Sequence, residues 1–170
     1  MKRLIAVGLL LCSRAALADD MVLNVPGETW SLHLQAPAMQ EINQSDEPPS
    51  HVYTGNAGRF NLSLYVEKPD CDGGDSRQNL AKCFVKKVQR NPYIVKGTLA
   101  NNPAAGGVLI TYLMELPVRG EKIRAFNSHY VFAHNGMWGD LHISVVKATD
   151  EDFATVGDVI RSVEFVEDKK

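Results

Sequence analysis

The sequence lacks an excess of positive charge and any long hydrophobic run. It contains 18 basic and 20 acidic residues, for a formal net charge of -2 at pH 7. Nucleic-acid binding is therefore disfavoured, because it needs a concentrated basic surface. The longest apolar run lies in residues 4–12 and is far shorter than the roughly 20 residues that span a bilayer. The composition predicts a protein without a nucleic-acid partner and without a membrane span.

Motifs that would identify an enzyme or a cofactor are also missing. The sequence contains no G-x-S-x-G nucleophile elbow and no C-x-x-C pair. Its glycine pairs, Gly73-Gly74 and Gly106-Gly107, are not followed by the Lys and Ser or Thr of a phosphate-binding loop. No cofactor is predicted, and a catalytic role is not indicated.

The first 18 residues have the pattern of a secretory signal peptide. Lys2 and Arg3 form a basic start, an apolar segment follows, and Ala16-Leu17-Ala18 is an A-x-A cleavage site. Lipidation at Cys12 is disfavoured, because the bulky Leu11 precedes it. Cleavage after Ala18 predicts an exported protein, and the short basic start favours the bacterial periplasm.

Removal of the signal leaves residues 19–170 as one predicted domain of 152 residues. This length is sufficient for a single hydrophobic core, and no linker or repeat divides it. Three basic residues leave with the signal, so the remaining 15 basic and 20 acidic residues give a net charge of -5.

Two of the three cysteines, Cys71 and Cys83, remain after cleavage. An even pair in an exported chain predicts a disulfide. A metal site at this pair is disfavoured because no histidine lies nearby in the sequence. A redox role is disfavoured because redox pairs lie closer together along the chain. We expect the bond to hold the loop at residues 69–75 against the helix that follows.

Residues 121–166 contain the strongest structural signals. Asn135-Gly136 separates two runs rich in β-branched and aromatic residues, which predicts a two-residue hairpin. Counting outward from that turn places His129 opposite His142. Side chains alternate between the faces of a strand, so an apolar face is predicted at Phe126, Tyr130, Phe132, Leu141, Ile143 and Val145. The opposite, polar face carries Asn127, His129, Trp138, Asp140, His142 and Ser144.

Two helices are predicted on either side of this hairpin in the sequence. One covers residues 76–90, with Ser76 as its cap and an apolar stripe on one side. The other begins at the capping pair Thr149 and Asp152 and places Phe153, Val156 and Val159 on its buried side. Each helix has one apolar face, so both are expected to lie on a sheet.

Further strands are predicted from alternating or continuous apolar patterns. A turn at Arg119-Gly120 would place Glu115 opposite Arg124. Residues 36–49 are expected to form a surface excursion with one helical turn near residues 39–42, and residues 101–107 a loop. The remaining strands are predicted at 22–25, 29–35, 51–54, 59–67, 93–99, 108–116 and 163–166, with a hairpin turn at 55–58. The predicted fold class is α+β, with a mostly antiparallel sheet of six to eight strands flanked by helices.

The order of these elements resembles the PsbP-like α/β/α sandwich, which includes the bacterial periplasmic DcrB group. The resemblance rests on ETWSLHLQAP, on GRFNLSLYVEK and above all on the ending WGDLHISVVKATDEDFATVGDVIRSVEF. It implies a sheet covered by helices and a non-enzymatic role in binding or assembly. Cys71 and Cys83 depart from the general pattern of that family.

The polar face of the hairpin carries two chemical hypotheses. His129, His142 and Asp140 could supply two imidazoles and a carboxylate to a metal such as zinc. The same residues with Ser144 could form a hydrolase site, although a serine on a flat strand is poorly placed for a triad. The alternative is that these side chains are polar surface, or are hydrogen-bonded beneath a covering helix.

Binding through a surface requires none of these special residues. Loops on a rigid sheet often make protein contacts, and Trp138 beside the hairpin turn is a candidate interface residue. A Trp138 packed in the core is the alternative. We therefore expect a periplasmic, non-catalytic accessory protein that acts by protein–protein contact. An immunity protein that neutralises a delivered toxin is a specific version of this function.

Overall fold

The computed structural model of the chain describes residues 18–47 and 50–168. The predicted signal peptide, apart from Ala18, lies outside the described residues. Within the described residues, the chain forms two helices and ten strands. None of these helices is long and apolar enough to cross a membrane. The helices are α1 (Arg77–Val88) and α2 (Asp150–Arg161), and the strands are β1 (Ala18–Asn24), β2 (Trp30–Pro37), β3 (Glu41–Ser45), β4 (Ser50–Ala57), β5 (Phe60–Glu67), β6 (Ala100–Ala104), β7 (Gly107–Val118), β8 (Glu121–His134), β9 (Met137–Val146) and β10 (Glu164–Glu167).

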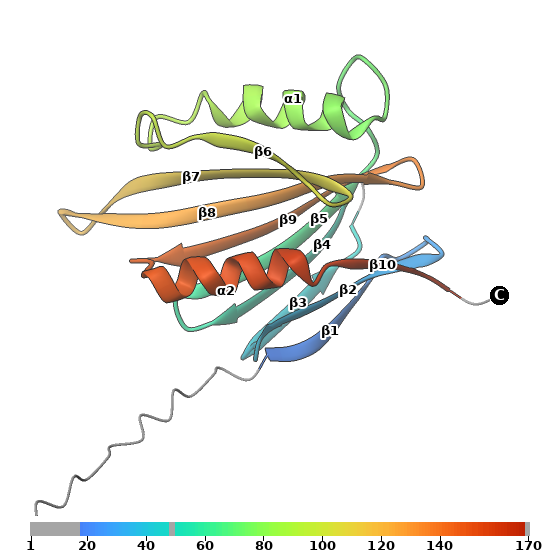
Figure 1. The fold of residues 1–170 in the computed structure, drawn as a ribbon, viewed down its shortest axis with the longest axis horizontal. Coiled ribbons are helices and arrows are strands. Elements are labelled where there is room, and N and C mark those ends of the chain that lie inside the picture. The colour runs from blue at the N-terminus through green and yellow to red at the C-terminus, as the bar shows by residue number, and fades with distance from the viewer. Residues whose placement is uncertain (1–17, 48–49, 169–170) are drawn as a thin grey trace, which may run out of the picture.

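The strands form two antiparallel sheets (Figure 1). The larger sheet has seven strands in the order β3-β4-β5-β9-β8-β7-β6, and the smaller has three in the order β1-β2-β10. The predicted α+β class with a mostly antiparallel, helix-flanked sheet is confirmed. The second sheet accounts for strands beyond the predicted six to eight.

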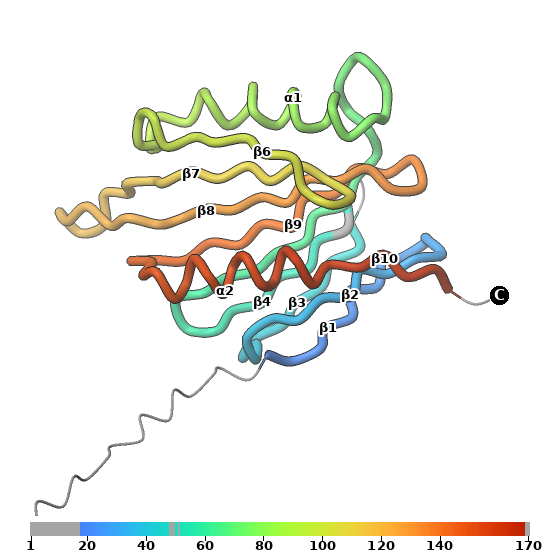
Figure 2. The backbone as a smooth tube through the Cα atoms, viewed as in Figure 1, coloured from blue at the N-terminus to red at the C-terminus, as the bar shows by residue number. Residues whose placement is uncertain are grey.

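The two faces of the seven-stranded sheet are covered by different elements. On one face, α2 and the three-stranded sheet enclose the main core, in which Trp30, Leu32 and Phe132 are almost fully buried. On the other face, Leu80 and Ala81 of α1 pack on side chains of β7, β8 and β9. The course of the backbone in Figure 2 shows α1 and α2 as separate layers.

The register of the central hairpin agrees with the prediction. Asn135 and Gly136 both have positive φ values, 48° and 75°, as the two-residue turn requires. His129 pairs with His142, and Phe126 pairs with Val145. Because side chains alternate along each strand, the predicted apolar residues face the main core and the predicted polar residues lie on the opposite face, which α1 covers in part.

The second predicted turn is also confirmed. Arg119 and Gly120 have φ values of 49° and 85°. Glu115 lies opposite Arg124, whose Nε donates to the Glu115 carboxylate at 2.7 Å.

Several segments differ from the prediction. Residues 41–45 form β3, an edge strand with five exposed residues, and not a surface excursion with a helical turn. The predicted loop at 101–107 is largely occupied by the edge strand β6 and its turn into β7. Both were missed because an edge strand pairs on one side only, so it tolerates proline and lacks a buried alternating face.

The boundaries near two other predicted elements also change. Residues 93–99 are irregular, with a single bridge from Ile94 to Met114, and not a strand. The β4–β5 turn lies at Gly58-Arg59, and not at 55–58, because Ala57 pairs with Phe60. Phe153 of α2 is 42% exposed although the helical pattern placed it on the buried side. It lies at the margin of the core, where its ring and that of Phe126 form a T-shaped pair.

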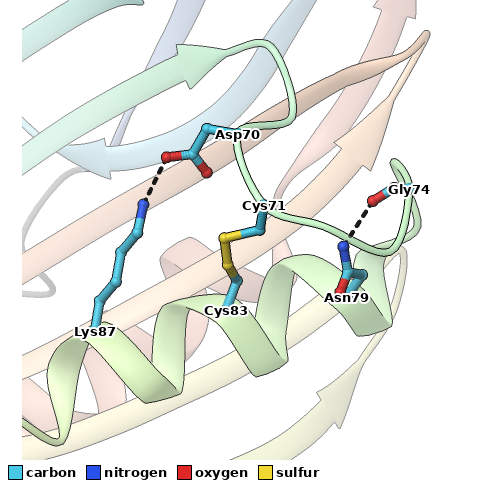
Figure 3. The surroundings of a disulfide bond; sticks show 6 residues. All are labelled: Asp70, Cys71, Gly74, Asn79, Cys83 and Lys87. Atoms are coloured by element: carbon cyan, nitrogen blue, oxygen red, sulfur yellow. Dashed lines mark hydrogen bonds and ion pairs between the residues drawn. A yellow bond between two sulfur atoms is a disulfide. The ribbon is translucent and has the colours of Figure 1, made fainter.

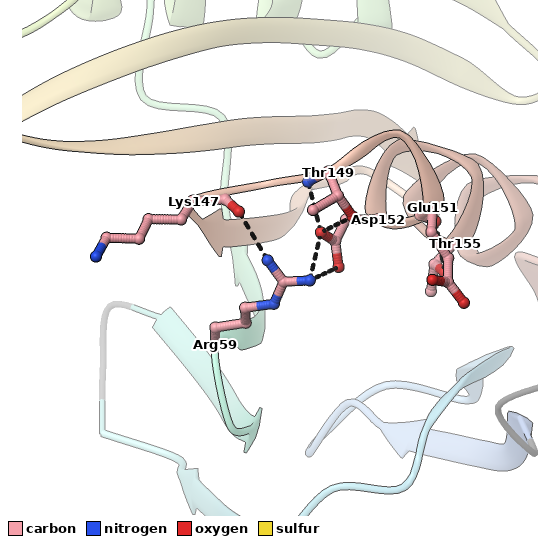
Figure 4. A network of polar contacts seen from close by, with 6 residues as sticks. All are labelled: Arg59, Lys147, Thr149, Glu151, Asp152 and Thr155. Atoms are coloured by element: carbon pink, nitrogen blue, oxygen red, sulfur yellow. Dashed lines mark hydrogen bonds and ion pairs between the residues drawn. The ribbon is translucent and has the colours of Figure 1, made fainter.

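The N-terminus of α2 is tied to the sheet by a polar network (Figure 4). The Asp152 carboxylate accepts hydrogen bonds from the backbone N–H and the hydroxyl of Thr149, at 2.6 and 2.7 Å. Arg59, in the β4–β5 turn, donates to the same carboxylate and to the Lys147 carbonyl. The predicted capping pair is therefore present, and Arg59 extends it to a strand turn more than 90 positions away in the sequence.

The predicted disulfide between Cys71 and Cys83 is present, with a Cα–Cα distance of 6.6 Å. It joins the loop before α1 to the second turn of that helix (Figure 3). On either side of it, Lys87 pairs with Asp70 at 2.8 Å, and the Asn79 amide donates to the Gly74 carbonyl. The loop is thus held on α1 at three places along the helix.

Candidate functional site

A cluster of polar side chains lies between α1 and the seven-stranded sheet. Strands β7, β8 and β9 bring these residues together because adjacent antiparallel positions on one face are neighbours. We call this group the buried polar cluster. It consists of Tyr112, Asn127, His129, Asp140 and His142.

His129 is at the centre of the buried polar cluster and is 5% exposed. Its Nδ1 lies 3.0 Å from both carboxylate oxygens of Asp140, and its Nε2 lies 2.9 Å from the Tyr112 hydroxyl. Phe84 of α1 covers the ring at a centroid distance of 4.6 Å. Both ring nitrogens are therefore hydrogen-bonded inside the fold.

His142 stacks on His129 and is held neutral. Asn127 donates its amide N–H to the Ala125 carbonyl, so its amide oxygen is left to accept from His142 Nε2 at 3.0 Å. Burial and, to a smaller extent, the neighbouring His129 lower the pKa of His142 to about 4, against the opposing effect of Asp140. The same environment raises the pKa of Tyr112 to about 12, through burial and the charge of Asp140.

The predicted metal-binding residues are brought together, but as a hydrogen-bonded network. The rings of His129 and His142 are parallel, with centroids 4.0 Å apart. The lone pairs of an imidazole lie in the plane of its ring, so two parallel stacked rings do not aim them at one point. A metal bound by His129, His142 and Asp140 stays a hypothesis, and it would require at least one ring to rotate and to give up a hydrogen bond.

The hydrolase hypothesis receives no geometric support. Ser144 pairs with Asn127 on one side and Asn61 on the other, and no hydrogen bond among the described residues joins it to His129 or His142. Activation of a serine requires a base within hydrogen-bonding reach.

Trp138 is not placed as an interface residue. Its side chain is 1% exposed and packs with Leu80 and Ala81 beneath α1, and its indole Nε1 donates to the Asp75 carbonyl at 2.8 Å. The structure therefore corrects the prediction of an exposed surface anchor: Trp138 is packed beneath α1, which is the alternative that the sequence left open.

The helix α1 does not cover the whole polar face of the sheet. It packs on β7, β8 and β9, so the same face of β3, β4 and β5 is left open. A depression of about 320 Å³ lies there. We call it the sheet groove. It is lined by Glu41, Asn43, Thr54, Gly55, Asn56, Asn61, Leu62, Ser63, His142 and Ser144.

A second depression of about 170 Å³ lies between α1 and strands β5 and β9. We call it the α1 cleft. It is lined by Tyr65, Glu67, Asp70, Leu80, Cys83, Phe84, Lys87, Trp138, Gly139 and Asp140. Asp140 belongs both to this cleft and to the buried polar cluster, and His142 belongs both to the cluster and to the sheet groove.

Tyr112 and Phe84 were not predicted as members of this site. The register set by the Arg119-Gly120 turn pairs Tyr112 with Asn127, which would have placed the tyrosine near His129. Phe84 could not be located from periodicity, since the position of α1 across the sheet depends on tertiary packing.

Comparison with known proteins identifies no family. No family model matches the sequence, and no curated protein matches it. Two solved structures align with this chain at 13% sequence identity. LpqN of Mycobacterium tuberculosis, described as involved in cell envelope biogenesis, aligns over 90% of this chain and 87% of its own with a TM-score of 0.44. A protein from Bacteroides thetaiotaomicron aligns over 82% of this chain and 46% of its own, with a TM-score of 0.38. The PsbP-like resemblance is not confirmed by these matches.

Proposed function

We propose that the chain is an exported, non-catalytic binding protein that acts by contact with another protein. The observation that carries this proposal is the contrast between the two halves of the polar sheet face. Beneath α1, the polar groups of His129 and Tyr112 are bonded to one another. On β3, β4 and β5 the polar side chains line an open groove.

The chemistry of the sheet groove favours recognition over catalysis. Its lining is mostly neutral amide and hydroxyl groups, and Glu41 is its one carboxylate. Adaptable hydrogen-bonding groups of this kind are common in protein-binding surfaces. The groove is continuous with β3, the exposed edge strand of the sheet, whose free backbone groups can pair with an extended segment of a partner.

Export to the periplasm is part of this proposal. It is supported by the signal-peptide pattern of the first 18 residues and by the Cys71–Cys83 disulfide, since such bonds persist in oxidising compartments. Mass spectrometry of protein recovered from the periplasm of an expressing bacterium tests it. A mature chain beginning at Asp19 is expected, and an unprocessed chain retained in the cytoplasm would contradict export.

Capture of partners by immobilised protein tests the binding function. Three proteins are compared: the wild type, the groove variant Thr54→Arg/Asn61→Arg, and the control variant Val22→Arg. Val22 is 51% exposed on β1, in the three-stranded sheet, and does not line the groove. The expected result is one protein retained in stoichiometric amount by the wild type and by the control but not by the groove variant.

The identity and charge of that protein would refine the function. An acidic chain with a net charge of -5 after cleavage suits a basic partner, and a toxin with an adjacent gene would make this chain its immunity protein. Equal retention of the partner by all three proteins would show that the sheet groove is not the binding site. Enzymatic turnover without a retained protein would overturn the binding function.

A further inference from the structure

The α1 cleft combines an apolar interior with an acidic rim. Leu80, Phe84 and Trp138 supply its apolar walls, and Tyr65 lies at its border with the open sheet face. Its volume is about 170 Å³. It has room for a single long side chain and not for a folded segment.

The charges around the α1 cleft do not balance. Three carboxylates line it, from Glu67, Asp70 and Asp140, against one cation, Lys87. Asp70 is paired with Lys87 and Asp140 accepts from His129. Glu67 makes no ion pair within the described part of the chain. Burial raises the pKa of Glu67, and the neighbouring Asp70 and Asp140 raise it further against the opposing effect of Lys87.

The Lys87–Asp70 pair shows how this rim accommodates an ammonium group. In Figure 3 the Lys87 side chain extends from α1 along the flank of the disulfide to Asp70, and the Nζ–Oδ2 distance is 2.8 Å. A cation with a similar aliphatic stem, arriving from outside, would find the remaining carboxylate of Glu67 and the apolar walls below it. Long basic side chains pack in this manner, with the stem on apolar surface and the charged head at its margin.

We propose that the α1 cleft receives a lysine or arginine side chain of the protein partner. This inference rests on the proposed binding function and names the chemistry that the partner presents. The aliphatic stem lies against Phe84 and Leu80, and the charged head pairs with Glu67. The cleft and the sheet groove then form one contact surface, since Asp140, Tyr65 and Ser63 lie on the same face of adjacent strands.

Other occupants fit the α1 cleft less well. A purely apolar side chain would cover the Glu67 carboxylate without giving it a partner, which carries a desolvation cost. An anionic group would be repelled by three carboxylates against one lysine. A cation with an apolar stem can pack its stem on the apolar walls and pair its charge with the Glu67 carboxylate at the rim.

The test is a titration of the mature protein with n-butylammonium, followed by nuclear magnetic resonance. The chain has two tryptophans, and their indole N–H groups report on different places. Trp138 lines the α1 cleft, whereas Trp30 lies in the main core. Saturable shifts are expected for the Trp138 indole and the Gly139 amide, with the Trp30 indole unchanged.

Neutral and anionic probes with the same carbon chain serve as controls. We expect n-butanol to bind about fivefold more weakly than n-butylammonium, and butyrate to give no saturable shift. That ratio corresponds to about 1 kcal/mol for the charged contact. Equal affinity for n-butanol would reduce the cleft to a plain apolar pocket and overturn the proposal, as would the absence of any shift at Trp138.

A matched pair of variants locates the effect. Glu67→Gln removes the unpaired carboxylate and is expected to weaken n-butylammonium binding about fivefold, to the level of n-butanol. Glu164→Gln makes the same change on β10 of the other sheet and should leave binding unchanged. An unchanged Trp30 resonance confirms that each variant is folded. Because this titration needs no partner, its failure is distinguishable from a failure of protein capture.

Discussion

The imidazole rings of His129 and His142 lie parallel, with their centroids 4.0 Å apart and their planes inclined by 1°. Such contact disfavours two positive charges, because protonation of one ring raises the cost of protonating the other. The Asp140 carboxylate is hydrogen-bonded to His129 Nδ1 and therefore contacts His129 more directly than His142. His142 is therefore the neutral member of the pair at pH 7.

Acid should destabilise the protein through His142. Folding lowers its pKa from 6.5 to about 4, so the unfolded chain binds more protons in this interval. The contribution of His142 to the free energy of unfolding is fully present above about pH 6.5. It decreases by about 3 kcal/mol as the pH falls towards 4. Urea unfolding of the wild type and of His142→Gln between pH 4 and 7 measures it. The variant should lose this part of the pH dependence; identical slopes for both proteins would show that His142 does not titrate as inferred.

Removal of the disulfide should lower stability by about 3 kcal/mol, because the bond closes a short loop in the unfolded chain. The variant is Cys71→Ser/Cys83→Ser, in which Lys87–Asp70 and Asn79–Gly74 are left to hold the loop on α1. Urea denaturation with and without reductant measures the effect. Reductant should shift the wild type towards the variant and leave the variant unchanged. A wild type that alkylates at both cysteines without reduction would rule out the bond in solution.

The start of α2 should depend on Asp152. Its carboxylate accepts from Thr149 and from Arg59, so Asp152→Ala removes a helix cap together with a link to the β4–β5 turn. A loss of about 1 to 2 kcal/mol is expected, measured by thermal unfolding. Asp150→Ala is the control, since Asp150 lies in the same helical turn but outside this network. Equal losses for the two variants would indicate a general charge effect at the helix N-terminus.

Gly139 should not tolerate a side chain. A Cβ atom at this position would overlap the Phe132 ring, which lies directly over the glycine. Gly139→Ala should cost about 1 to 3 kcal/mol, and less in a Phe132→Leu background, where the ring is absent. By contrast, Gly157→Ala in α2 meets only the movable end of Arg161 and should stabilise the helix by about 0.5 to 1 kcal/mol. A cost at Gly139 that does not depend on residue 132 would place its cause elsewhere.

The parts of the fold that could be predicted from the sequence are those determined by interactions between residues close together in the chain. Asn135-Gly136 and Arg119-Gly120 can adopt the positive φ values of tight turns, and each turn determines the register of the strands that it joins. Ser76 and Asp152 likewise mark helix starts through bonds to nearby backbone groups. Edge strands β3 and β6 carry no such signal, because neither has a buried face to impose alternation.

The candidate site was predicted only in part for a related reason. The pairing of His129 with His142 follows from the turn, but what covers the two rings depends on where α1 lies. Hydrophobic periodicity shows that a helix has a buried side without specifying which strands receive it. The placement of α1 over β7, β8 and β9 encloses Trp138 and leaves the sheet groove open, and neither outcome can be derived from the helix sequence alone.

The three-stranded sheet constrains when the chain can finish folding. Its central strand β2 pairs on one side with β1, near the start of the chain, and on the other with β10, where Glu164 pairs with His33. Contacts between such distant positions form late and slow folding. Until β10 has been synthesised, one edge of β2 and the side of the main core beneath Phe165 stay uncovered. The three-stranded sheet of a nascent chain therefore stays incomplete until nearly the last residues have been synthesised.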